Sequence, residues 1–478
     1  GLYVASCFLF MCQATIIIPD SLALAKDLGL QGWAPVFSGL LIGSSFFLFG
    51  LTFVLVTRKL MLPPWNQYRN FLTILGAHIG YIIFGMVYVL AANPPDSADD
   101  PRVRAPLLVL SRLGLGVCGA LNGGLLRQMA LLVTPHCELV FFNMMRTVVG
   151  ISLGVGFGPF VSAGVNQVQL VWAAQDDSQL SLFVFFDDSL RSKAAIPSFV
   201  IAACILVLIF VYVAQTPREQ SRFDYLVRHK ERLDVEHADP ASDEPKSPGG
   251  IRVPASAITA RKRQQLWMYS LLVGMERVLL VSGLEAATSM LLEMEFGIKD
   301  VNNGLIIGST FVAGMPIAMF PIFIRRRKDW KGDRIMVFVL AALTVPCSLL
   351  LFIWPNTYGT SFGLWSIIVS DTFSYASAYS CQGMVEGFAF TYAMQPHPSG
   401  WSQENYIITT ALLYDTGGRF LGPPLGRWLI GAYGRSAYAG VQLFLSVLSL
   451  ATVFSFMNLL HAPTHATERT PLKGGRSV

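Results

Sequence analysis

The segment SGLLIGSSF at residues 38–46 returns as NGLIIGSTF at residues 303–311, 265 positions further along the chain. A second pair of segments has nearly the same separation. The Gly-Pro steps of LGVGFGPF at 153–160 and of GRFLGPPL at 418–425 lie 264 positions apart. Two independent matches at one separation are not expected by chance, so they indicate that the chain is a duplicated unit.

The composition indicates whether this duplicated unit is soluble or lies in a membrane. Hydrophobic residues make up 53% of the 478 residues, and charged residues make up only 14%. A soluble domain usually carries about 25% charged residues. A charge placed in hydrocarbon costs several kcal/mol, so a lipid-facing surface has few of them. The composition therefore predicts an integral membrane protein.

Twelve apolar stretches reach the minimum of roughly 17 residues that a membrane-spanning helix needs. They lie at 1–18, 34–57, 70–92, 105–132, 139–165, 195–214, 265–292, 302–324, 334–354, 360–394, 405–432 and 436–460. With the duplication, they predict an all-α membrane protein of twelve transmembrane helices. These helices would form two pseudo-symmetric six-helix bundles, at residues 1–214 and 265–460.

Polar segments follow each predicted bundle. Residues 215–264 are rich in charge, Pro and Ser, and they cannot bury enough apolar surface to fold alone. We expect a linker there, with one surface helix near 218–236, and a disordered tail at 461–478. Basic residues gather in this linker and in the loops on its side, whereas acidic residues gather in the opposite loops. By the positive-inside rule, the linker and both termini are expected to be cytosolic.

The fourth predicted helix carries an arginine and a glycine stripe within SRLGLGVCGALNGGLLRQ at 111–128. Arg112 lies four residues before Gly116, so both occupy one face of the helix. An arginine inside a membrane is costly unless it faces the bundle interior or a water-filled cavity. We therefore interpret Arg112 as a functional candidate, and Asn122 as a second polar candidate on this helix.

The fifth predicted helix, at 146–164, contains Gly154, Gly158 and Pro159. Glycines four residues apart let two helix backbones approach closely, and a proline weakens a helix locally. The matching positions in the second half are Gly418, Gly422 and Pro423. Both segments predict a hinge or a sliding contact between the halves.

These motifs resemble those of the major facilitator superfamily. The segment from Arg112 to Gly116 is similar to its fourth-helix motif, and GVGFGP is similar to its fifth-helix motif. Gly422-Pro423 is similar to the eleventh-helix counterpart. The resemblance spans essentially the whole chain in topology, and it implies a transporter of this fold.

The loop after the second predicted helix resembles the superfamily's cytosolic signature in its basic residues. These are Arg58, Lys59 and Arg69, whereas the signature's Asp is absent and the loop is longer. The resemblance implies that the three basic residues form a cytosolic gate.

Two further stretches resemble the vacuolar and lysosomal branch of the superfamily. They are residues 70–92, with the run that ends at Arg112, and GLEAATSMLLEMEFGI at 283–298. This branch includes the SPX-associated phosphate transporters and the ceroid-lipofuscinosis-type lysosomal proteins. It implies an endomembrane location, of vacuolar or lysosomal type, and leaves the plasma membrane as the alternative. The paired arginines that follow the asparagine in the phosphate transporters are absent after Asn122, so phosphate is not inferred.

Ionisable residues inside the predicted helices are the remaining candidates for solute binding and coupling. A buried carboxylate can carry a proton, and a buried arginine can hold an anion through paired hydrogen bonds. Asp415 and Arg419 have the spacing of an i, i+4 ion pair. The other carboxylate candidates are Glu285, Asp371 and Glu386, and the arginine candidates are Arg112 and Arg146.

Together these features predict a secondary active transporter that moves a small solute by alternating access. Proton coupling and selectivity for an anion are the refinements that the buried charges indicate. We expect a monomer in the lipid bilayer, with a small molecule or ion as substrate and with no cofactor, metal or nucleic-acid partner. The sequence has no HExxH, GxSxG or P-loop motif, so an enzyme is not expected. Two alternatives stay open, an ion channel of the same fold and a transport-inactive receptor or scaffold.

Overall fold

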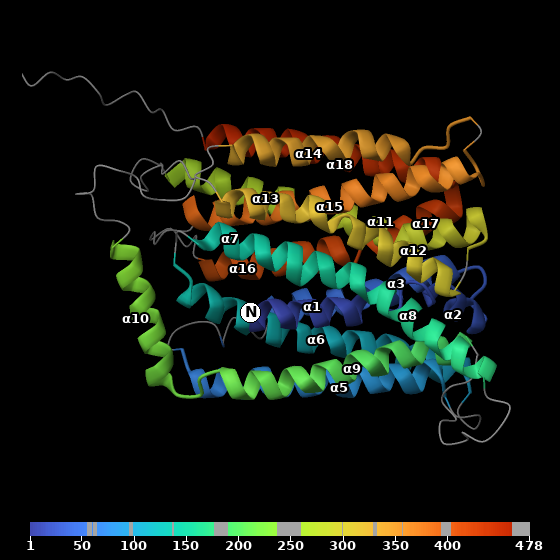
Figure 1. Ribbon diagram of the computed structural model, residues 1–478, viewed down its shortest axis with the longest axis horizontal. Coiled ribbons are helices and arrows are strands. Elements are labelled where there is room, and N and C mark those ends of the chain that lie inside the picture. Colours follow the sequence, from blue (N-terminus) through green and yellow to red (C-terminus); the bar gives the residue numbers. More distant parts are fainter. Residues whose placement is uncertain are drawn as a thin grey trace, which may run out of the picture.

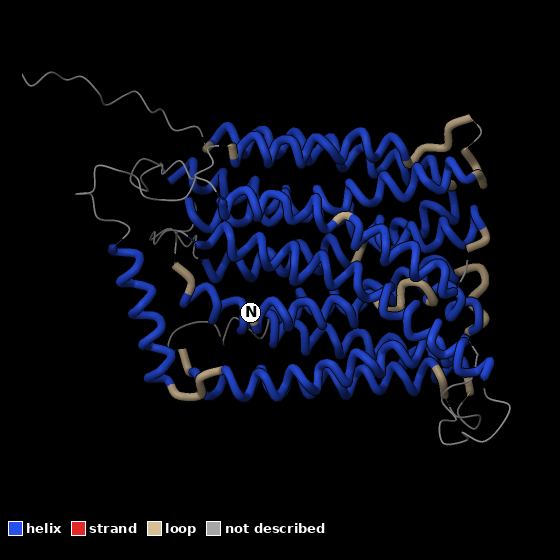
Figure 2. Tube along the Cα trace, viewed as in Figure 1, coloured by secondary structure: helices blue, strands red, loops and turns tan. Residues whose placement is uncertain are grey.

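The computed structural model describes most of the chain and shows helices throughout, with no strand among the described residues (Figure 2). The described residues are 1–54, 60, 65–94, 99–135, 138–175, 190–236, 260–298, 300–327, 332–355, 357–392 and 403–460. The candidate gate residues Arg58 and Lys59, residues 237–259 of the linker and the predicted tail lie outside them.

Nine helical segments are described in the first half of the chain. They are α1 (Leu2–Thr15), α2 (Ser21–Asp27), α3 (Ala34–Thr52), α5 (Gln67–Ala92), α6 (Pro101–Val133), α7 (Leu139–Met145), η4 (Arg146–Ser152), α8 (Leu153–Gln175) and α9 (Leu190–Gln215). The segment η4 is a π-helix that joins α7 and α8 without a break. The long helices lie side by side, with α5 and α9 at the outer edge of this half (Figure 1).

The second half repeats the arrangement. Its segments are α11 (Ala260–Phe296), α12 (Asp300–Ala313), α13 (Met315–Arg327), α14 (Asp333–Leu350), α15 (Ser361–Tyr392), α16 (Gln403–Thr410), η6 (Ala411–Arg419), α17 (Gly422–Tyr433) and α18 (Arg435–Leu459). A second π-helix, η6, occupies the place that corresponds to η4. Helices α14 and α18 form the opposite outer edge (Figure 1).

Helix α10 (Gln220–Glu236) lies between the two halves in the sequence, and in space it lies across one end of the bundle (Figure 1). Its position matches the surface helix expected near 218–236. Gln67, at the start of α5, holds this end together, because its backbone N–H donates to Gln220 Oε1 at 2.9 Å and its side chain donates to Pro217 O at 2.7 Å. We call this end of the bundle the linker side and the opposite end the far side.

Each of the twelve predicted spans coincides with a helix or with consecutive helices, and the all-α membrane fold is confirmed. Within the described ranges, eight helices are long and apolar enough to cross a membrane. The remaining four spans coincide with α1, α11, α15 and the run from α16 to α17. Helix α1 has only 14 residues, and a turn at 420–421 interrupts the last of these runs. Helices α11 and α15 are long and continuous, but they carry buried charged side chains, such as Glu285 and Glu386.

The repeated segment that revealed the duplication packs against the other half of the molecule. In α3, a Cβ added at Gly39 would lie 2.5 Å from Pro424 Cα, and one added at Gly43 would lie 2.5 Å from the backbone oxygen of Phe420. Real Cβ atoms do not come so near to other atoms, so only glycine allows α3 to cross the η6–α17 region at this distance.

The second copy of the segment makes the equivalent crossing. In α12, a Cβ at Gly304 would lie 3.0 Å from Pro159 O, and one at Gly308 would lie 2.6 Å from Phe160 Cβ. Both partners belong to α8 of the first half. Each copy therefore packs against the Gly-Pro segment of the opposite half, and the two crossings are related by the internal repeat.

The glycines of the Gly-Pro segments face the other way, into their own halves. A Cβ at Gly154 or Gly158 would meet backbone atoms of α1, and a Cβ at Gly418 or Gly422 would meet backbone atoms of α11. The Gly-Pro region of each half is thus held between the first helix of its own half and a glycine pair of the other half. This arrangement sets the positions of η4 and η6 at the centre of the molecule.

Candidate functional site

A cavity of about 70 Å³ lies between the two halves. Segments α1, α3, α5, α6 and η4 line it from the first half, and α11, α15, α16 and η6 line it from the second. Both π-helices border it, and π-helical turns occur frequently at functional sites because they alter the register of side chains. The charged residues on the cavity wall are Arg127, Arg146, Asp415 and Arg419.

On the linker side of the cavity, two arginines of the first half converge on one carboxylate of the second. Nη2 of Arg127 donates to Glu386 Oε2 at 3.1 Å, and Nη2 of Arg146 donates to the same oxygen at 2.5 Å. The other oxygen, Oε1, accepts from Gln382 Nε2 at 2.9 Å. The Glu386 side chain is only 1% exposed. This buried cluster, formed by Arg127, Arg146 and Glu386, is called here the arginine–glutamate latch, and it joins the halves.

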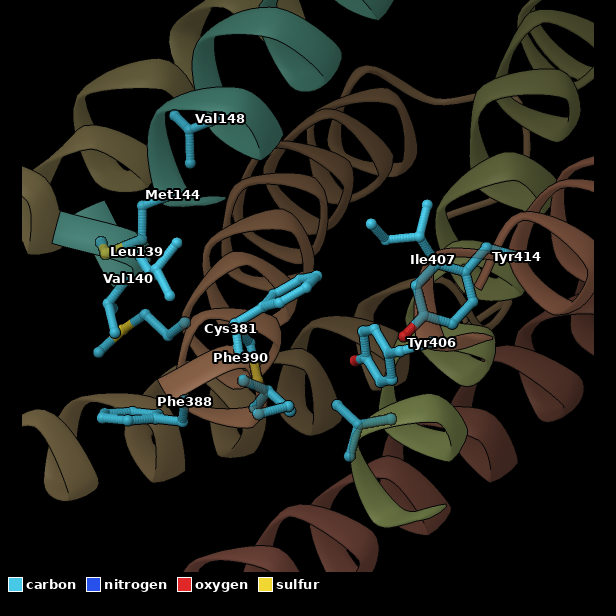
Figure 3. Packing of buried hydrophobic residues seen from close by; sticks show 14 of the residues in the cluster. Leu139, Val140, Met144, Val148, Cys381, Phe388, Phe390, Tyr406, Ile407 and Tyr414 are labelled. Atoms are coloured by element: carbon cyan, nitrogen blue, oxygen red, sulfur yellow. The ribbon is translucent and has the colours of Figure 1, made fainter. Parts of the chain in front are cut away.

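Close packing of α7 and η4 on α15 brings the latch together. A Cβ at Gly387 would lie 2.6 Å from Val140 Cα, and one at Gly383 would lie 3.2 Å from Met144 Cα. Figure 3 shows Val140 and Met144 on one side of this contact and Phe388 on the other. The small residues of α15 thus let its backbone approach α7 closely enough for Glu386 to reach the two arginines.

A second polar cluster lies deeper in the second half, around Arg419. Its Nη2 donates to Tyr379 Oη at 3.0 Å, and Tyr379 Oη donates in turn to Glu285 Oε1 at 3.2 Å. Arg419 Nε also lies 3.6 Å from Asp415 Oδ1, so the i, i+4 ion pair exists. The guanidinium stacks 5.2 Å from the ring of Phe46, which belongs to the first half. The cluster therefore connects the buried Glu285 carboxylate and the partly exposed Asp415 carboxylate to the surface where the halves meet.

On the far side, Arg427 of α17 joins the halves. It donates to Ser21 Oγ at 2.9 Å and to Ile18 O at 3.2 Å in the first half, and to Ala286 O at 3.0 Å in the second. Nearby, Lys26 Nζ lies 2.6 Å from Glu293 Oε1. The sequence analysis did not select Arg427, although an arginine inside an apolar run was a usable signal.

Two of the predicted candidates lie away from the cavity wall. The Asp371 carboxylate accepts a hydrogen bond from Thr288 Oγ1, inside the second half. The Asn122 side chain donates to Ser6 Oγ at 2.6 Å and lies 3.2 Å from His78 Nε2. Of these partners only Ser6 borders the cavity. Arg69, the described member of the predicted gate, is exposed, and its backbone N–H donates to Oδ1 of Asn66, which caps the start of α5.

Arg112 also lies away from the cavity wall, although it was a candidate for anion binding. Its guanidinium donates to Gln13 O at 2.8 Å and to Ala14 O. Helix α1 ends at Thr15, and the last carbonyls of a helix have no partner within it. Arg112 satisfies two of these carbonyls and so fixes the end of α1 on α6.

Replacing Arg112 with glutamine is therefore expected to lower the melting temperature of the purified protein by several degrees. A hydrogen bond from a charged group stabilises a fold by about 1.5–3 kcal/mol, and two of them would be weakened. Thermal unfolding in detergent, compared with Arg112→Lys, measures the effect. An unchanged melting temperature with a raised KM would show instead that Arg112 binds the solute.

Comparison with solved structures identifies the fold. The chain is similar to the human organic anion transporter MFSD10, with a TM-score of 0.56 and 17% identity over 95% of this chain and 98% of that one. It is similar to the inward-open xylose transporter XylE of E. coli, with a TM-score of 0.57 and 13% identity over 95% of each chain. A bacterial homologue of the iron transporter ferroportin, in its outward-facing state, has a TM-score of 0.51 and 13% identity over 93% of this chain and 99% of that one.

XylE is a proton:xylose symporter of the major facilitator superfamily. The chain therefore has the fold of major facilitator transporters. No protein-family model and no curated protein sequence matches it.

Proposed function

We propose that this protein is a secondary active transporter, which carries a small solute across a membrane by alternating access. The observation that carries this proposal is the pair of crossings between the halves, Gly43 on Phe420 and Gly308 on Phe160. Equivalent contacts on both sides of a central cavity let two rigid bundles rock against each other. The similar structures were solved in inward-open and outward-facing states, which supports such a motion in this fold.

The polar contacts between the halves favour a carrier over a channel. Glu386 meets Arg127 and Arg146 on the linker side of the cavity, and Arg427 meets the first half on the far side. A carrier needs a closure on each side that opens in turn, whereas a channel needs an open path. A receptor or scaffold needs neither the cavity nor the closures.

Proton coupling is proposed for the cluster around Arg419. Glu285 reaches this arginine through Tyr379, so a change in its protonation would alter hydrogen bonds at the surface between the halves. Glu386 is a second candidate, because it takes part directly in a contact between the halves. One similar structure, XylE, is described as a proton symporter, which supports coupling in this fold.

The orientation, location and assembly of the protein are part of the same proposal. The basic residues of the linker support a cytosolic linker side, with both termini on that side. The resemblance of residues 283–298 to the vacuolar and lysosomal branch supports a membrane of that type, and the plasma membrane is the alternative. We propose a monomer. Protease cleavage of the linker in sealed vesicles of known orientation tests the first point.

The test of transport is counterflow by the purified protein in liposomes, with a panel of labelled anions, neutral solutes and cations. Uptake that exchanges with unlabelled solute inside the vesicle is the expected result. Conductance without exchange would favour a channel, and the absence of both with every solute would favour a receptor or scaffold.

Replacing Glu285 with glutamine is expected to make the transport rate independent of an imposed pH gradient. The matched control is Glu276→Gln, on the same helix, because the Glu276 carboxylate faces α18 and accepts from Thr452 Oγ1 at 3.2 Å. We expect the control to keep the dependence of the parent protein. If Glu285→Gln responds to the gradient as the control does, Glu285 is not the coupling group.

A further inference from the structure

The solved neighbours do not identify the solute, because they are described as transporters of organic anions, xylose and iron. The cavity wall of this chain does distinguish among these classes. Of the charged side chains that line the cavity in the described structure, three are the guanidinium groups of Arg127, Arg146 and Arg419, and one is the carboxylate of Asp415. Glu386 is not on the wall. Cationic groups on the wall therefore outnumber anionic ones by three to one.

The latch arginines also have unused hydrogen-bonding capacity. The Nε–H groups of Arg127 and Arg146 are buried and have no acceptor among the described residues. A buried donor without an acceptor costs about 1–3 kcal/mol. A guanidinium group binds a carboxylate best through two parallel N–H donors. Each arginine could make this arrangement with a ligand carboxylate, and neither makes it with Glu386, to which each presents only one Nη2 donor.

Most of the remaining wall is aromatic or apolar, and its uncharged polar side chains besides the tyrosines are Ser6, Gln382 and Thr410. The rings of Phe10 and Phe49 lie 5.6 Å apart, and those of Phe49 and Phe53 lie 6.0 Å apart, so they form one continuous surface. Tyr3, Tyr81 and Tyr414 border the same cavity. An aromatic surface of this kind suits an apolar body, which gains from leaving water.

We propose that the cavity binds organic anions with one carboxylate and an apolar, preferably aromatic, body, and that the ligand carboxylate replaces Glu386 on Arg127 and Arg146. The apolar body lies against the wall formed by Phe10, Phe49 and Phe53. This inference rests on the proposed transport function and specifies its substrate class.

The exchange has a mechanical consequence. Glu386 belongs to the second half, whereas both arginines belong to the first. When a ligand carboxylate takes the arginines, the latch no longer ties the halves together on the linker side. Binding of the substrate would then itself favour opening of that side, because the ligand contributes the contacts that the closed state loses.

The experiment compares two ligands that differ only in charge, 4-phenylbutyrate and its neutral amide, 4-phenylbutanamide. Their binding to the purified full-length chain in detergent is measured by isothermal titration calorimetry. The carboxylate is expected to bind at least about tenfold more tightly, which corresponds to about 1.4 kcal/mol, close to the lower end of the range of about 1.5–3 kcal/mol for one charge-assisted hydrogen bond.

Substitutions then test the assigned residues. In Arg127→Gln and Arg146→Gln the preference for the carboxylate is expected to fall to within a factor of about three, because each loses one guanidinium group. Glu386→Gln is expected to bind the carboxylate several-fold more tightly without changing the affinity for the amide, because the internal competitor is gone. The control is Arg228→Gln on the exposed face of α10, which makes the same change of charge away from the cavity.

Equal affinity for the two ligands in the parent protein would overturn the inference, and so would a preference that persists in both arginine variants. The absence of binding by either ligand would overturn it as well. None of these results would remove the transport proposal, which fails only if counterflow is absent with every solute in the panel. If a glutamine variant does not fold, Arg146→Lys and Glu386→Asp replace it, with a reduced preference and a weakened internal competitor as their expected results.

Discussion

Gly43→Val and Gly308→Val are each expected to reduce the transport rate by at least about tenfold, with the folded protein still recovered from detergent. A Cβ at Gly43 would lie 2.5 Å from the backbone oxygen of Phe420, and a Cβ at Gly308 would lie 2.6–2.8 Å from Phe160 atoms. Neither contact can be relieved by turning a side chain, so the crossing helices must separate. Separation of helices that rely on close packing costs about 1–3 kcal/mol, and tenfold corresponds to about 1.4 kcal/mol.

The controls for this prediction are Gly76→Val in the first half and Gly440→Val in the second. Both glycines lie in transmembrane helices, and a Cβ at either position would have no atom within 4 Å. Counterflow rates of the four variants are compared at equal amounts of monodisperse protein. Transport by Gly43→Val or Gly308→Val at the rate of its control would show that the crossings do not limit the motion of the halves.

Arg427→Gln is expected to open the far side of the cavity. The arginine ties Ile18 and Ser21 of the first half to Ala286 of the second, and hydrogen bonds from a charged group contribute about 1.5–3 kcal/mol each. Losing even one of the contacts between the halves shifts the equilibrium toward the open state by about tenfold or more. The substitution Ala25→Cys reports this opening, because Ala25 is buried in the apolar cluster that closes the far side.

The measurement is the rate at which a membrane-impermeant thiol reagent labels the thiol introduced by Ala25→Cys, with and without Arg427→Gln. We expect the rate to rise by about tenfold, in line with the lost hydrogen bonds. Arg435→Gln is the control, because Arg435 makes its hydrogen bonds within the second half, to Leu351 O at 2.6 Å and Glu295 Oε1 at 3.0 Å. Equal labelling in the two arginine variants would mean that Arg427 only stabilises the fold and does not hold the far side closed.

The overall architecture could be predicted from the sequence because it depends on composition and on a repeat. Apolar stretches of the right length, and two segments at one separation, are visible without knowing any contact. The partners of the repeated glycines were not visible. Two glycines four residues apart, such as Gly39 and Gly43, indicate close packing on that face, but the partner of Gly43, Phe420, lies in the other half of the chain.

The candidate site was predicted less completely, for a physical reason. A buried arginine must be paired, but its position in the sequence does not specify the partner. Arg112 was interpreted as a substrate-binding candidate, and it donates instead to carbonyls at the end of α1, which exist only because that helix ends at Thr15. Arg127 was not among the selected residues, and its partner Glu386 lies 259 positions further along the chain.

The two glycine crossings have the geometry of a twofold dimer interface within one chain. Gly39 and Gly43 contact the partner half as Gly304 and Gly308 contact the first, so the same patch is used in both directions. Such an interface is isologous, and two identical six-helix subunits could form it without any new contact. The linker raises the local concentration of one half near the other. The two halves, produced as separate polypeptides, therefore have the surfaces needed to assemble into the complete molecule.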